Sequence, residues 1–162
     1  MMSFFIAGVP QPAGSKRAFA IRGKDGNIVK RASGADMIAV TDANPKAKPW
    51  QAIVRADAHI VMARQTRGPR AGAIRLELFF VLKRPKSHYR TGKRANELHD
   101  WAVKLQPIGK PDVLKLARAV EDACTGIIWL DDAQITEEFL RKRYAAHGES
   151  TGVEVHVRSM DW

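Results

Sequence analysis

The stretch GKPDVLKLARAVEDACTGIIWLDDAQ, residues 109–134, decides the fold of this 162-residue chain, because it joins a helix to two acidic positions. The apolar residues of this stretch recur at the spacing of a helix that buries one face. They are Val113, Leu116, Ala117, Val120, Ala123 and Cys124. Asp112 suits the N-cap of this helix, and Thr125-Gly126 predicts its end. The apolar run Ile127–Leu130 then predicts a short strand that ends in Asp131-Asp132.

The acidic residues at both ends of this stretch point to chemistry on phosphates. Carboxylates held within a few ångströms repel one another, so such a cluster binds a divalent cation or shares a proton. Oxygen ligands suit Mg²⁺ or Mn²⁺, which activate water for in-line displacement at phosphorus. Lys115 or Arg118 could stabilise the charge of the transition state. The stretch therefore has the outline of a phosphodiesterase, with a metal ion expected where the acidic residues of its two ends converge.

Leu114 is out of place in this pattern. It lies on the stripe opposite the apolar face, where the other residues are charged: Lys115, Arg118, Glu121 and Asp122. The helical spacing therefore predicts an apolar side chain in a polar row.

The motif resembles that of the RusA-type Holliday-junction resolvases, also called crossover junction endodeoxyribonucleases. The matching positions are Lys110-Pro111-Asp112, Lys115-Leu116, Arg118, Asp122-Ala123 and Asp131-Asp132-Ala133-Gln134. By this resemblance Asp112 and Asp132 are metal ligands with Asp131 beside them. Arg118 takes the place of the catalytic cation. The resemblance implies a homodimeric, Mg²⁺-dependent (or Mn²⁺-dependent) endonuclease that resolves four-way junctions in DNA recombination and repair.

The family carries a second metal-binding Asp where this chain has Leu114. The loss of a residue that only supports a metal ligand typically costs about 10- to 100-fold, and the loss of a ligand should cost at least as much. A junction-binding protein with lost or reduced cleavage is therefore an alternative, as is a basic nucleic-acid-binding module. Glu137 or Glu138 could replace the missing ligand, but strand alternation puts only one of them on the face of Asp132.

The composition points to a polyanionic partner. Lys and Arg outnumber Asp and Glu by 27 to 17, giving a formal net charge of +10. The single cysteine, Cys124, excludes an intrachain disulfide, and we expect it in the core. There is no apolar run of 18 residues and no signal-peptide pattern, so we expect no membrane contact and a cytoplasmic protein, with a prophage as one candidate origin.

Two basic segments, residues 16–31 and 83–95, predict contacts with DNA phosphates. With the cations around Asp112, the candidate DNA-binding residues are Lys16, Arg17, Lys83, Arg84, Lys86, Arg90, Lys110 and Lys115. His88 and Tyr89 lie within the second segment and could stack on unpaired bases at a branch point. For residues 16–31, a solvated hairpin is the alternative.

The order of elements predicts one α+β domain over residues 1–162, with a mixed sheet and two main helices packed against it. The expected strands are 3–9, 37–40, 73–82, 127–130, 135–144 and 152–158. We expect 73–82 to be central, and a hairpin through His147-Gly148 to join the last two strands. Besides the helix after Asp112, a helix over 49–65 is predicted. Its core face comprises Trp50, Ile53, Val54, Ile60 and Val61, with Asp57 in the middle.

Overall fold

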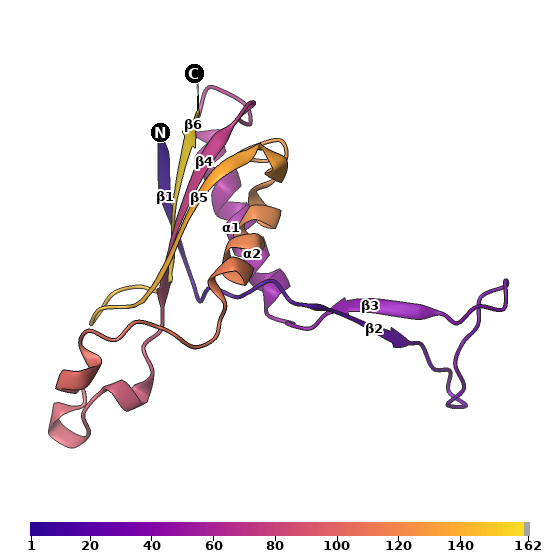
Figure 1. Cartoon of the computed structure of the whole chain (residues 1–162), viewed down its shortest axis with the longest axis horizontal. Coiled ribbons are helices and arrows are strands. Elements are labelled where there is room, and N and C mark those ends of the chain that lie inside the picture. The colour runs from indigo at the N-terminus through magenta and orange to yellow at the C-terminus, as the bar shows by residue number, and fades with distance from the viewer. Residues whose placement is uncertain (161–162) are drawn as a thin grey trace.

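A four-stranded mixed sheet forms the base of the fold in the computed structural model, which describes residues 1–160 (Figure 1). The strands are β1 (Met2–Ala7), β4 (Ile74–Leu82), β5 (Ile135–Tyr144) and β6 (Gly152–Ser159). Their order is β1-β6-β4-β5. Strand β4 pairs with β5 in parallel and with β6 antiparallel, and it is the central strand predicted from its apolar content.

Helices α1 (Ala47–Ala63) and α2 (Val113–Cys124) pack against each other on one face of this sheet (Figure 1). The fully buried part of α2 comprises Leu116, Ala117, Ala119, Val120, Ala123 and Cys124. These residues meet alternate side chains of β4, including Leu76, Leu78 and Phe80, in one hydrophobic core. The prediction of a single α+β domain with two helices on a mixed sheet is therefore confirmed. Neither helix combines the length and the apolar character needed to cross a bilayer.

Two segments extend from this body in opposite directions (Figure 1). The first is an antiparallel arm of β2 (Lys16–Ala20) and β3 (Ile38–Asp42). A bridge between Arg22 and Ile28 closes the local turn expected within residues 16–31, but the main pairing of the arm reaches beyond that segment to β3. The second is the connection from β4 to α2, residues 83–112, which contains the short 3-10 turns η1 (Lys86–His88), η2 (Gly92–Arg94) and η3 (Asp100–Ala102).

Two predictions about local structure are wrong, one for a hairpin and one for a strand. The hairpin through His147-Gly148 does not form, because β4 lies between β5 and β6 in the sheet. The chain enters β5 parallel to β4 after crossing over through α2, so its last two strands cannot be neighbours. Residues Ile127–Leu130 are not a strand; they form a turn that buries Ile128 and Trp129 under the end of α2.

The core face of α1 is also narrower than predicted. Trp50 and Val54 are buried, but Ile53 and Ile60 are exposed. The other buried residues of α1 are small: Ala47 and Ala58. The sequence placed both isoleucines within the helical stripe, but only part of that stripe is buried against the body, so both side chains meet water.

Candidate functional site

The first turn of α2 is held in place by β5. Asp112 is the N-cap, and its Oδ1 accepts a hydrogen bond from the Leu114 amide at 3.0 Å. The Lys142 ammonium of β5 donates to the carbonyl oxygens of Gly109 and Pro111, each at 2.8 Å. Leu114 itself is 64% exposed, so the residue that broke the charged row does face solvent.

Asp131 and Gln134 form a capping box around the turn η4 (Asp132–Gln134). The Asp131 Oδ1 accepts from the Ala133 amide at 2.8 Å. The Gln134 Oε1 accepts from the amides of Leu130 and Asp131, and its Nε2 donates to the carbonyls of Arg70 and Gly72. One oxygen of Asp131 is thus occupied in shaping the turn that presents Asp132.

Asp132 lines a recess of about 350 Å³ together with Glu121 of α2 and Glu138 of β5. Burial, a hydrogen bond with Glu138, and the charges of Asp122 and Asp132 raise the pKa of Glu121 to about 8. Glu121 therefore favours its protonated form at neutral pH. Of the two candidates on β5, Glu138 faces this recess, whereas Glu137 forms an ion pair with Arg75 at 3.3 Å.

Asp112 and Asp132 do not meet within one chain. Asp132 lies beside Glu121, nine residues along α2 from Asp112. At 1.5 Å per residue this places the two acidic positions about 13 Å apart along the helix axis. Oxygens that share one Mg²⁺ each lie about 2 Å from the ion. The expected convergence on a single ion is therefore not met by one copy of the chain.

A single chain also offers an incomplete set of metal ligands. Across residues 1–160, no three His, Cys, Asp or Glu side chains lie close enough to enclose an ion. The carboxylates of the Asp132 recess are the right chemical type, since hard divalent cations take oxygen ligands. The recess fits a divalent cation in donor chemistry, and it needs at least one further ligand.

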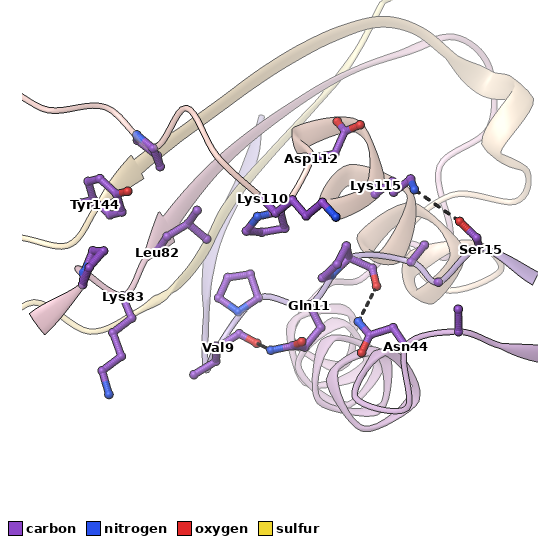
Figure 2. Close-up of a pocket in the computed structure, with 18 residues that line it drawn as sticks. Val9, Gln11, Ser15, Asn44, Leu82, Lys83, Lys110, Asp112, Lys115 and Tyr144 are labelled. Carbon is purple, nitrogen blue, oxygen red and sulfur yellow. Dashed lines mark hydrogen bonds between the residues drawn. The ribbon is translucent and has the colours of Figure 1, made fainter. Parts of the chain in front are cut away.

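A basic groove of about 770 Å³ runs beside Asp112 (Figure 2). Its cations are Lys83, Lys110 and Lys115, and the Tyr144 ring lies at its far end from Asp112. The Lys115 ammonium is 3.4 Å from the Ser15 hydroxyl, which ties α2 to the start of the arm. The groove therefore joins an acidic N-cap to a row of positive charges, an arrangement that suits a phosphate backbone.

The comparison with protein families decides the class. A family profile described as endodeoxyribonuclease RusA matches residues 24–158, which is most of the chain. This chain belongs to the RusA family of endodeoxyribonucleases. A search of curated proteins found no match. The members of this family are Holliday-junction endodeoxyribonucleases, and their activity depends on a metal ion.

Arg118, which the resemblance predicts to be the catalytic cation, lies on α2 between the two acidic regions. Leu114, Arg118 and Glu121 are spaced four and three residues apart, so they share one helix face. Arg118 also lines a recess of about 470 Å³ with Lys16 of the arm and Asp122. Arg118 is exposed.

The candidate DNA-binding cations of this RusA protein fall into two groups. Lys16, Arg17, Lys83 and Lys86 are exposed, as are Lys110 and Lys115. Arg84 instead donates to the Ala102 carbonyl at 2.8 Å and lies over the Tyr144 ring. Arg90 forms an ion pair with Asp100 at 3.0 Å and donates to the Leu98 carbonyl. The latter two hold the 83–112 connection together.

Sequence reasoning did not single out Glu121 or Lys142. A signal for Glu121 was available, because it lies seven residues after Leu114 on the same helix face. No sequence signal marks Lys142, one of several cations on β5, since its role depends on β5 lying beside the start of α2. Cys124 is a core residue, as predicted, and burial raises the pKa of its thiol to about 12, which excludes a thiolate nucleophile.

Proposed function

We propose that this RusA-family protein cuts opposed strands of a Holliday junction as a Mg²⁺-dependent homodimer, using Asp112, Asp132 and Arg118. The observation that carries the proposal is that two acidic regions flank one face of α2, next to a basic groove. A junction has two symmetric cutting sites, so a two-fold enzyme matches its substrate.

The metal-binding part of the proposal rests on the Asp132 recess. Asp132 would hold the ion, and Glu121 and Glu138 line the same recess, so either could contribute an oxygen once Glu121 has lost its proton. Asp131 adjoins them and keeps one oxygen free of the capping bond. A bound Mg²⁺ supplies an activated water and neutralises charge on the phosphate. Arg118 stabilises the negative charge that develops on the phosphate.

The dimer would complete this site. Asp112 and Asp132 are about 13 Å apart along α2, so one ion cannot bind both from the same copy. A two-fold arrangement that sets Asp112 of one copy against Asp132 of the other supplies the missing ligand twice. The exposure of Asp112, Leu114 and Asp132 is compatible with such a contact.

Leu114 favours a second candidate, a junction-binding protein with reduced cleavage. The side chain lies two residues after Asp112 in the first helical turn, and 64% of it is exposed. An aspartate there would project from the same turn as the N-cap carboxylate. Compared with aspartate, leucine removes one negative charge and one metal ligand from the site. This weakens metal binding and leaves DNA binding by the basic groove unchanged.

A cleavage assay separates the two candidates. Wild type and Leu114→Asp are compared on a four-way junction and on linear duplex of the same sequence, with Mg²⁺ or Mn²⁺. We expect Leu114→Asp to cut the junction at least about 10-fold faster than wild type. Ile60→Asp is the control, because it adds the same charge at an exposed position of α1.

Equal rates for wild type and Leu114→Asp would show that the missing carboxylate is dispensable and would leave the nuclease proposal in its full form. Tight junction binding without cutting by either protein would leave the binding function alone. Equal cutting of junction and duplex would refute the selectivity for branched DNA.

A further inference from the structure

The 83–112 connection carries an exposed aromatic platform that the proposed chemistry does not use. Trp101 lies in η3 and is 58% exposed, although tryptophan is the largest apolar side chain. The His99 ring stacks on the indole with a centroid distance of 5.6 Å and an interplanar angle of 16°. Even with His99 stacked on it, more than half of the Trp101 surface is open to solvent.

Ring contacts and backbone hydrogen bonds fix the position of the indole. The buried His88 ring meets Trp101 edge-on at 5.4 Å and Tyr144 edge-on at 5.2 Å. The His99 amide donates to the His88 carbonyl at 3.0 Å, and the Ala102 amide donates to the His99 carbonyl at 2.8 Å. Little conformational entropy would be lost when a ligand stacks on such a preorganised ring.

The charge around the platform identifies the kind of partner. Residues 83–110 contain eight Lys and Arg against two acidic residues. Glu97 and Asp100 are both paired with arginines of the same segment, so neither acid of residues 83–110 is unpaired. A polyanion that also offers flat rings fits this surface, and a nucleic acid is such a partner.

A series of ring contacts links the Trp101 platform to the basic groove. Tyr144 lines the groove that holds Lys110 and Asp112, and its ring contacts His88, which contacts Trp101. A DNA backbone that follows the groove from Asp112 towards Tyr144 (Figure 2) approaches the contact between His88 and Trp101. A paired base inside a duplex has both faces covered by its neighbours, so a free face is available only on an unpaired base.

We propose that Trp101, backed by His99, stacks on a nucleobase that is unpaired at the branch point of the junction. This inference rests on the proposed junction substrate and assigns a part of it to a defined side chain. Trp101 therefore acts in recognition. Its indole contacts a base next to the cleavage site and raises the affinity for DNA that has an unpaired base there. Of the residues predicted to stack, His88 is buried and supports Trp101 from below.

Binding is measured by fluorescence anisotropy in EDTA, which stops cleavage, on a four-way junction and on duplex at one fixed salt concentration. We expect Trp101→Ala to bind the junction about 5- to 100-fold more weakly and duplex within twofold of wild type. Trp101→Phe keeps an aromatic face and should retain most of the junction affinity. Lys86→Ala, an exposed cation of the same segment, should weaken both complexes alike.

A second readout reports the stacking directly. The fluorescent base 2-aminopurine, placed at the branch point, should be quenched by wild type and Trp101→Phe but not by Trp101→Ala. The stacking proposal is overturned if Trp101→Ala keeps the wild-type preference for the junction, or weakens junction and duplex equally. A change in oligomeric state in Trp101→Ala would instead place the indole between copies of the chain. Wild type that binds both DNAs equally would refute the proposed function itself, and the stacking with it.

Discussion

Replacing Glu121 by glutamine should stabilise the protein at high pH, because the surroundings of this carboxyl group disfavour its ionised form. Its pKa rises from 4.5 to about 8, mainly through burial and then through Glu138, Asp122 and Asp132. An acid with a raised folded pKa stabilises the fold when protonated. Its contribution is present below about pH 4.5, and it is lost as the pH rises to about 8. Glutamine resembles the protonated acid at every pH.

The size of the effect follows from the same shift. A rise from 4.5 to about 8 would correspond to about 5 kcal/mol for a carboxyl fully removed from water. Glu121 is only half-buried, and solvent screening reduces this to about 1–2 kcal/mol. For a chain of this length, that amounts to about 2–8 °C in the melting temperature.

Thermal melting of wild type and Glu121→Gln in EDTA at pH 4 and pH 9 tests the reasoning. We expect a higher melting temperature for the variant at pH 9 and no difference at pH 4. Added Mg²⁺ should raise the melting temperature of wild type at pH 9 more than that of Glu121→Gln. Glu137→Gln is the control, because Glu137 pairs with Arg75 outside the recess. A variant that melts at or below the wild-type temperature at pH 9 would refute the proposed crowding of carboxylates.

Three further predictions concern the residues that position the site. Gln134→Ala removes four hydrogen bonds to Leu130, Asp131, Arg70 and Gly72, and should cost about 2–4 kcal/mol in urea unfolding. Lys142→Met frees the carbonyls before α2 and should lower junction cleavage about 10-fold, with junction binding in EDTA unchanged. The Arg143 guanidinium lowers the pKa of Glu149 to about 2, so this pair stabilises the fold above about pH 4.5 and is lost as the pH falls towards 2. Glu149→Gln should therefore melt earlier than wild type at pH 7 and equally at pH 2; equal melting at pH 7 would contradict this.

The sequence predicted those parts of the fold in which local pattern and tertiary context agree. The apolar spacing of α2 and the strand content of β4 were read correctly, because α2 buries one face along its length and β4 buries alternate side chains. The hairpin through His147-Gly148 was not, since strand order is fixed by the crossover through α2 and leaves no local signal.

The sequence offered candidate residues for the site but not their arrangement. The motif identified Asp112, Arg118 and Asp132, but their spacing along the chain says nothing about which end of α2 each carboxylate meets. Glu138 reaches the recess only because β5 runs back along α2. Trp101 had no periodicity to mark it, and its exposure depends on how the turns of the 83–112 connection fold around His88.

The most direct test of the shared site mixes two inactive variants, Asp112→Asn and Asp132→Asn, in whichever of the wild-type and Leu114→Asp backgrounds cuts the junction. After subunit exchange, about half of the dimers are mixed. Each mixed dimer then holds one intact site if Asp112 of one copy serves Asp132 of the other. We predict that the mixture nicks the junction with Mg²⁺ while neither variant does so alone. A mixture that forms mixed dimers by mass and still does not nick would contradict the shared site.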